Sequence, residues 1–398
     1  MNRRHATTAM AGFLIVFASW CAAVAEPPLP EPAMDSAMER DPALELPPLQ
    51  VVFTKGLKPL WLRALAGPEA DLQREVAQMI ARAHRLGFPE MKETAGPLIK
   101  VLSTDNQRPA VRLAIARTLV ALDARDAATP LFELLGEEGL SFAQVVEPAL
   151  ATWDHKPIRK TWMARLEDTR SRRGLLQLAI RGLGQVRESE AADPLWRVAR
   201  NRAASVTLRI DAAAALGRIR DSGLVDRAQT LAANKTRRGL VDRLVAGNLL
   251  SRHSDEPTQR LLLELSVDRE PAVAAVALRR LLEIDSMLVI SIAADLLNNP
   301  DANVRMLAAR SLATHAVPAS VKQLGPVMKD RHPDVRRFAC RTLFSFGLQE
   351  QLQSVVRETA TQILSQEDWR GQEQAAFLMG AFDHEPSEIR RASCMERV

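Results

Sequence analysis

The chain has 398 residues and a formal net charge of +5 at pH 7. Hydrophobic residues (47%) and charged residues (25%) stand in the proportions of a folded soluble protein, which excludes a largely disordered chain. Aromatic residues are only 4% and tyrosine is absent, so the core must be built from Leu, Val, Ile and Ala. Few segments alternate with period two, and we therefore expect an all-α protein.

The first 25 residues have the three parts of a secretory signal peptide. Arg3 and Arg4 give a positive start, residues 11–20 are apolar, and residues 23–25 (Ala-Val-Ala) form a small-x-small ending. We therefore expect residues 1–25 to be removed by cleavage before Glu26, and the mature protein to be periplasmic or extracellular.

An uncleaved membrane anchor is the alternative for this segment. The uncharged run over residues 6–25 is twenty residues long, close to the lower limit for a helix that spans a bilayer. A lipoprotein is disfavoured, because Trp20 rather than a small residue precedes Cys21.

Residues 26–50 differ in composition from the rest of the chain. They are rich in proline and hold six acidic residues against the single base Arg40. A segment with so little apolar surface cannot pack a core, so we expect an acidic, disordered linker. Residues 51–398 then carry 50 basic and 42 acidic residues, which makes this region mildly basic.

An apolar pattern returns nine times at intervals of about thirty to forty residues. Each copy has an apolar residue, a small or β-branched residue four positions later, and another apolar residue four positions after that. The copies are Leu72/Val76/Ile80, Val111/Ile115/Leu119, Val145/Ala149/Trp153, Leu175/Ala179/Leu183, Leu208/Ala212/Leu216, Val241/Val245/Leu249, Val273/Ala277/Leu281, Val304/Ala308/Leu312 and Val335/Ala339/Leu343. This recurrence predicts a stacked-repeat solenoid, a fold that grows by adding units.

Each unit reads as two antiparallel helices. Val304, Ala308 and Leu312 share one face at helical periodicity, and a small middle residue lets the neighbouring helix approach closely. A short polar link and a second apolar segment follow each copy. Prolines that suit the first turn of a helix open three of these second segments: Pro97, Pro130 and Pro194.

These units resemble HEAT repeats, in particular the short bacterial HEAT-like type first associated with phycobilisome lyases. The shared motif is an Asp a few residues before a Val-Arg pair, followed by Ala-x-x-x-Leu. It reads Asp330…Val335-Arg336…Ala339…Leu343, Asp301…Val304-Arg305…Ala308…Leu312 and, without the Ala, Asp105…Val111-Arg112…Leu119. The resemblance extends over about residues 57–365. It implies a right-handed α-solenoid of about nine to ten two-helix repeats within residues 51–398, with an incomplete C-terminal repeat.

The resemblance also assigns a role to arginines at the starts of the repeat helices. In HEAT proteins the Asp and Arg of the motif tie adjacent turns together, which implies a structural role for Arg112, Arg209, Arg305 and Arg336. The alternative is that these arginines line the inner surface and grip an acidic partner. The copy at Val145 breaks the pattern with Pro148 and Trp153, where we expect a bend or an exposed loop.

No pattern in the sequence specifies a reaction. No two histidines have metal-ligand spacing, and CxxC, HExxH, GxSxG and phosphate-binding loops are missing. We therefore expect no catalytic residue, no cofactor and no metal. An enzyme of the lyase or glycosylase type is an alternative by family analogy alone, since HEAT arrays serve many functions. Its one candidate for an acid beside an aromatic residue is Asp154 with Trp153.

Basic clusters in the middle third hint at a ligand, and their strongest members are Arg172, Arg173, Arg237 and Arg238. Solvated loop charge is the plainest interpretation. The other is a shallow groove for acidic protein segments, anionic glycans or lipid headgroups. Nucleic acid is disfavoured, because few aromatic residues are present to stack on bases. We expect a non-catalytic, exported scaffold for protein partners, with a membrane-tethered envelope organiser as the alternative.

Overall fold

In the computed structural model the chain divides into two units, Met1–Gln50 and Val51–Val398. The structure describes residues 56–168 and 170–383, which all belong to the second unit, and that unit is described by itself. The expected signal peptide (1–25), the expected linker (26–50) and residues 384–398 lie outside the described residues. Among the described helices, none is both long enough and apolar enough to cross a membrane.

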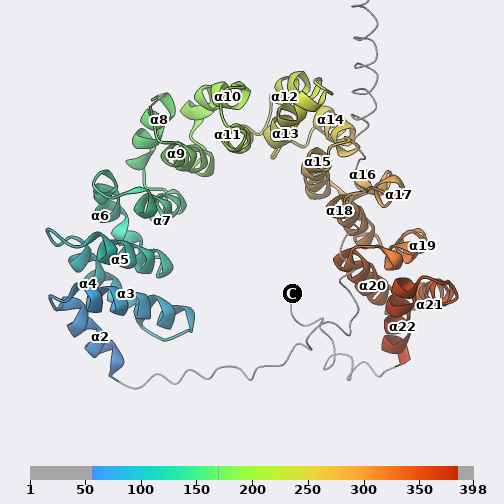
Figure 1. Cartoon of the computed structure of the whole chain (residues 1–398), viewed down its shortest axis with the longest axis horizontal. Coiled ribbons are helices and arrows are strands. Elements are labelled where there is room, and N and C mark those ends of the chain that lie inside the picture. The colour runs from blue at the N-terminus through green and yellow to red at the C-terminus, as the bar shows by residue number, and fades with distance from the viewer. Residues whose placement is uncertain (1–55, 169, 384–398) are drawn as a thin grey trace, which may run out of the picture. The chain divides into compact units, whose positions relative to one another are not determined.

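The described residues form twenty-one α-helices and no strand, and the helices pair into ten hairpins. In each hairpin an outer helix is followed by an inner helix that packs on it (Figure 1). The outer helices are α2 (Leu57–Ala66), α4 (Ala95–Leu102), α6 (Ala128–Glu133), α8 (Ile158–Glu167), α10 (Ala192–Arg200), α12 (Val225–Ala232), α14 (Glu256–Ser266), α16 (Ser286–Ile290) with α17 (Ala293–Leu296), α19 (Pro318–Leu324) and α21 (Glu350–Leu364). The inner helices are α3 (Ala70–Arg85), α5 (Pro109–Ala121), α7 (Leu140–Thr152), α9 (Arg173–Gln185), α11 (Val206–Ile219), α13 (Leu240–Leu249), α15 (Pro271–Ile284), α18 (Ala302–Ala313), α20 (Pro333–Gly347) and α22 (Trp369–Asp383). The predicted all-α solenoid of about nine to ten two-helix repeats is confirmed.

Short 3₁₀ turns lie in the connections or extend the outer helices. They are η2 (Met91–Thr94), η3 (Arg125–Ala127), η4 (Leu134–Gly136), η5 (Ser189–Ala191), η6 (Arg237–Gly239) and η7 (Gly325–Lys329). The predicted helix-opening prolines Pro97, Pro130 and Pro194 are each the third residue of an outer helix. There a missing N–H costs nothing, because the first N–H groups of a helix have no partner within it.

Each inner helix packs on the next inner helix, from α3 to α22. The third, seventh and eleventh positions counted from the start of each inner helix are the repeat anchors, and in α13 the eleventh position, Leu250, directly follows the helix. The residue at the seventh position is buried in all ten inner helices. These seventh residues are Val76, Ile115, Val146, Ala179, Ala212, Ala246, Ala277, Ala308, Ala339 and Ala375. Small or β-branched side chains at this position let neighbouring helices approach closely, and the core runs on from repeat to repeat.

The register differs from the prediction in α7. Its anchors by position are Phe142, Val146 and Leu150, all buried, instead of Val145, Ala149 and Trp153. The helix continues through Pro148, which is exposed, and Trp153 follows the end of the helix. The predicted register of α7 is wrong because this helix is apolar on more than one side. Two registers therefore fit the same spacing of apolar residues.

The register also differs by one residue in α13. Its anchors by position are Asp242, Ala246 and Leu250, instead of Val241, Val245 and Leu249. Asp242 is a buried carboxylate at a place that is apolar in most of the other repeats. The apolar pattern therefore predicted the neighbouring Val241 as the anchor, although Val241 is only half-buried.

The close packing of inner helices leaves no room for a side chain at Gly217 in α11. A Cβ atom there would lie 2.5 Å from the carbonyl oxygen of Leu249 and 2.9 Å from that of Asn248. Both atoms belong to the backbone of α13, so rotation of a side chain cannot relieve the contact.

We predict that Gly217→Ala lowers the free energy of unfolding by about 1–3 kcal/mol, because overpacking outweighs the better helix propensity of alanine. Gly380→Ala in α22 is the matched control, since a Cβ at Gly380 meets no atom within 4 Å. Urea denaturation followed by circular dichroism measures both variants. An unchanged or more stable Gly217→Ala protein would contradict the packing described here.

Candidate functional site

The fourth residue of most inner helices closes the turn that joins it to its outer helix. In six hairpins this residue is Gln or Arg, and its side chain donates to backbone carbonyl groups at the end of the outer helix or in the loop that follows it. The donors are Gln73, Arg209, Arg243, Arg305, Arg336 and Gln372, and the bonds measure 2.7–3.4 Å. The last carbonyls of a helix lack partners within it, and a helical side chain leans toward the N-terminus of its own helix, so the two groups meet.

The arginines at this position also reach the next repeat. Arg305 makes two hydrogen bonds to the Asp330 carboxylate, Nε to Oδ2 at 2.7 Å and Nη2 to Oδ1 at 2.8 Å. Arg209 donates to Asp242 of α13, and the two side chains are only 5% and 3% exposed. Arg112 lies 3.2 Å from Glu137 and 3.1 Å from Glu138.

These contacts favour the structural interpretation of the four predicted arginines. Arg209, Arg305 and Arg336 are buried, and Arg112 is half-buried against its two glutamates. Arg209 and Arg305 are buried with partners on two sides, so their guanidinium groups cannot meet an external ligand unless the hairpin opens. Their alternative role, gripping an acidic partner, is therefore not supported by the geometry.

Arg243 belongs to the same group and was missed from the sequence. It is 1% exposed, donates to the carbonyl groups of Asn234 and Thr236, and lies 2.7 Å from Asp268. The expected motif requires Val before Arg, but Asp242 stands in that place. Counting four residues from the start of the helix would have found it, because the turn fixes that position whatever residue precedes it.

Asp242 joins two arginines from the preceding repeat. Arg209 and Arg202 both donate to its carboxylate, the latter at 2.8 Å. Burial alone would raise the pKa of Asp242, but the hydrogen bonds and charges of Arg209 and Arg202 outweigh burial and bring this pKa below its usual value of 3.8. The pair therefore stabilises the folded chain above about pH 4.

We predict that Asp242→Asn lowers the free energy of unfolding at pH 7 by about 3 kcal/mol, because Arg209 stays buried without a counter-ion. The depressed pKa means that the carboxylate's contribution is present above pH 3.8 and is lost as the pH falls through the folded pKa. The difference between variant and natural protein should thus be constant from pH 7 to about pH 5 and shrink below about pH 4. Urea denaturation across this range measures it, with exposed Asp295→Asn as the control. A difference that grows at low pH would contradict this assignment.

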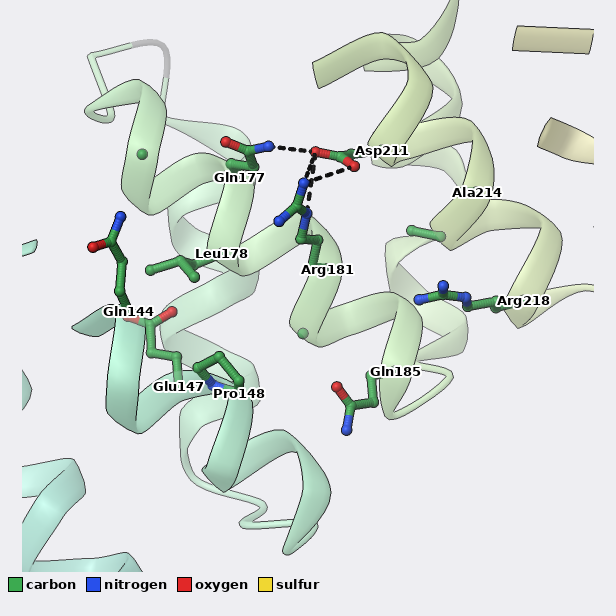
Figure 2. Close-up of a pocket in the computed structure, with 13 residues that line it drawn as sticks. Gln144, Glu147, Pro148, Gln177, Leu178, Arg181, Gln185, Asp211, Ala214 and Arg218 are labelled. Atoms are coloured by element: carbon green, nitrogen blue, oxygen red, sulfur yellow. Dashed lines mark hydrogen bonds and ion pairs between the residues drawn. The ribbon is translucent and has the colours of Figure 1, made fainter. Parts of the chain in front are cut away.

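A hollow of about 640 Å³ lies on the exposed side of α7, α9 and α11 (Figure 2). Its lining mixes polar and apolar residues, and the polar ones include Gln144, Gln177, Arg181, Gln185, Asp211 and Arg218. In Figure 2, Gln177 and Arg181 of α9 both point to Asp211 of α11. Gln177 Nε2 lies 2.7 Å from Asp211 Oδ2, and Arg181 Nε lies 3.2 Å from the same oxygen. The hollow thus offers amide and guanidinium donors on the faces of three adjacent repeats.

The carboxylates of this region are engaged in structural contacts. Glu147 lines the hollow, but its Oε2 accepts from the Trp162 indole at 2.9 Å and its Oε1 accepts from Arg165 at 2.6 Å. This buried acid beside Trp162 was not predicted from the sequence, because only Asp154 next to Trp153 was considered. Both of its oxygens hold α7 to α8, so it is not poised as a general acid.

The predicted pair Trp153 and Asp154 lies in a loop and is also occupied. The Trp153 indole donates to Asp123 of the preceding repeat at 2.6 Å, which holds the pKa of that carboxyl below its usual value. Hydrogen bonds from Lys156 and Arg159 likewise lower the pKa of Asp154. The described residues contain no group of three or more His, Cys, Asp or Glu side chains that could hold a metal ion.

The predicted basic residues lie in loops that lead into inner helices. Arg172 and Arg173 stand at the start of α9, and Arg237 and Arg238 form most of η6 before α13. We call these two segments the basic loops. All four side chains are exposed, and Arg173 donates a hydrogen bond of 3.5 Å to the Thr207 hydroxyl group. Arg202 lies between them in the loop before α11, where it pairs with Asp242.

Part of the chain matches a known family of repeats. A family model of HEAT repeats matches residues 258–339 and 290–357. No curated protein sequence matches the chain. The matched segments lie within residues 258–357, and there the family match supports the HEAT-type repeats that the motif around Val304 and Val335 predicted.

Several solved structures are similar at low identity. A chain in a structure of Kap95p with RanGDP is 14% identical with a TM-score of 0.43; the similarity covers 85% of this chain and 46% of that one. Human deoxyhypusine hydroxylase is 15% identical with a TM-score of 0.29, covering 76% and 100%. The complex of CpcE and CpcF of phycocyanin lyase from Nostoc sp. PCC7120 is 13% identical with a TM-score of 0.25, covering 80% and 98%. Likeness at this level assigns neither a partner nor a reaction to this chain.

Proposed function

We propose that this protein is an exported, non-catalytic HEAT-repeat scaffold that binds a protein partner. The observation that carries the proposal is the concentration of exposed donors on adjacent repeats. The hollow covers α7, α9 and α11, and the basic loops lie at the starts of α9 and α13. Arginine is enriched at protein interfaces, because its guanidinium group makes several directed hydrogen bonds to carboxylates.

A partner with an acidic surface fits this region best. The exposed arginines of the basic loops attract carboxylates, and complementary charge raises the rate and specificity of association. The non-catalytic part of the proposal is supported by Glu147, Asp123 and Asp154, whose carboxylates are each held by neighbouring donors. An anionic glycan or lipid headgroup is the competing ligand class, and the first experiment below separates it from a protein.

We predict that reversing the charge of the basic loops weakens partner binding by at least about tenfold. The variant carries Arg172→Glu, Arg173→Glu, Arg237→Glu and Arg238→Glu, and affinity capture from the envelope fraction measures it, followed by titration of each captured protein. A control with the same change in charge on exposed outer-helix residues carries Arg63→Glu, Lys100→Glu, Arg197→Glu and Lys322→Glu. If every captured protein binds the loop variant and the natural chain alike, the basic loops are not a docking surface. Capture that protease treatment of the fraction leaves unchanged would point to a glycan or lipid instead.

Export is proposed on the residues of the N-terminal segment alone. We predict that mass spectrometry of the protein produced in its native cells finds Glu26 as the first residue. Substitution of Ala25 by a bulky residue should block this processing, because signal peptidase sites require small residues. An intact Met1 in the membrane fraction would instead support a chain tethered by residues 6–25.

A further inference from the structure

The ninth residue of an inner helix lies on the exposed side of the inner row. In α7, α9 and α11 this residue is Pro148, Arg181 and Ala214, and all three line the hollow (Figure 2). Since the inner helices stack in one register, the ninth residues of later repeats continue the same line. This position is independent of the basic loops, which lie before the helices.

Three consecutive repeats carry arginine at this position. The ninth residues of α15, α18 and α20 are Arg279, Arg310 and Arg341, spaced 31 residues apart in the sequence. All three are exposed, and their helices follow one another in the inner row, with α15 packed on α18 and α18 on α20 (Figure 1). We call these residues the arginine row.

The arginine row is free to bind a ligand. Within the described part of the chain, none of its three guanidinium groups forms an ion pair or donates a hydrogen bond. Arg181, at the equivalent place in α9, is in contrast held by Asp211. The acids nearest in sequence are engaged elsewhere, since Glu283 pairs with Arg280 at 3.0 Å and Asp334 pairs with Arg337.

The spacing of the row suits an extended polypeptide. Packed helices lie about 8–10 Å apart, so successive arginines of the row repeat at about that distance. A polyproline II chain advances about 9 Å in three residues and returns to the same face. An acidic residue at every third position of such a chain therefore meets one arginine after another.

An exposed aromatic ring extends the row. The ninth residue of α22 is Phe377, which is 59% exposed, and α22 packs on α20 next to Arg341 in the series. Exposed aromatic rings are common docking points for proline-rich segments in the polyproline II conformation. Nucleic acid fits less well, because non-specific strand binding needs several stacking rings along the groove and this row offers Phe377 alone.

We propose that Arg279, Arg310 and Arg341 bind an extended acidic segment of a partner protein, with a carboxylate at every third residue and a proline or apolar residue against Phe377. The proposal names a ligand chemistry for the scaffold function, and it places that ligand on repeats that the basic loops do not touch.

The test measures binding of a fluorescein-labelled peptide of four Glu-Pro-Pro units to the purified full chain by fluorescence anisotropy. The triple variant Arg279→Glu, Arg310→Glu and Arg341→Glu should bind the peptide at least about 30-fold more weakly, since three ion pairs are replaced by repulsion. The milder triple change to Gln should weaken binding by about tenfold. A peptide of the same composition with its four Glu residues in one block should bind about tenfold more weakly than the periodic peptide.

Two controls make the result specific. The variant Arg197→Glu, Arg260→Glu and Lys322→Glu changes the net charge equally on exposed outer-helix residues, and it should alter the dissociation constant by less than about twofold. Circular dichroism and thermal unfolding of every variant should match the natural chain, because the row is exposed and unpaired.

The outcomes separate this proposal from the proposed function. Equal peptide binding by the natural chain and the arginine-row variants would overturn it, as would a twelve-residue oligo-dT that binds the row more tightly than the peptide. Loss of peptide binding in the basic-loop variant alone would move the peptide site to those loops and would also overturn it. A third outcome combines two results: the arginine-row variants lose peptide binding, and the basic-loop variant captures partners as the natural chain does. This outcome would support the present proposal and overturn only the docking surface assigned to the basic loops.

Discussion

The array depends on one recurring interaction, the hydrogen bonds from the fourth residue of an inner helix to carbonyl groups at the end of the preceding outer helix or in the loop that follows it. Arg305 shows its full form, since it donates to Asn299 and Pro300 and also binds Asp330 of the next repeat. One side chain thus satisfies two carbonyl groups of the turn within its own hairpin, and it also ties that hairpin to the next one. Gln73 and Gln372 do the first of these tasks in the first and last described hairpins. Because a solenoid has no single centre, each such contact stabilises mainly its own repeat and the next.

The same helices carry a second set of arginines with the opposite property. Arg305 and Arg310 lie on one helix, as do Arg336 and Arg341, but the first of each pair is buried and the second exposed. Five residues turn an α-helix through about 140°, so the two side chains point to different sides of the inner row. The buried member holds the repeat together, and the exposed member remains available for a ligand. Basic composition alone would not separate these roles.

The acidic side chains near the hollow and in the adjoining loops are engaged by neighbouring donors, which supports the proposal of a binding scaffold. Glu147, the one buried acid at the hollow, holds α8 through Trp162 and Arg165. Asp123 and Asp154 lie in loops, and their donors keep them ionised. A general acid or base needs a proton that it can exchange with a bound substrate. The hollow presents amide and guanidinium donors among apolar side chains.

The sequence by itself determined the architecture, because an apolar residue every four positions and a repeat of about thirty residues can bury a core only by stacking helical hairpins. The resemblance to HEAT repeats also singled out Arg112, Arg305 and Arg336, which follow a Val in the motif, and Arg209 at an equivalent helix start, as candidates for a structural role. Only the tertiary structure decided the register of α7 and α13, where Phe142 and Asp242 occupy anchor positions that hydrophobicity does not single out. It likewise decided which charges are available. Arg181 and Arg279 stand at equivalent positions of their helices. The next repeat offers Arg181 a carboxylate, that of Asp211, whereas no described carboxylate pairs with Arg279.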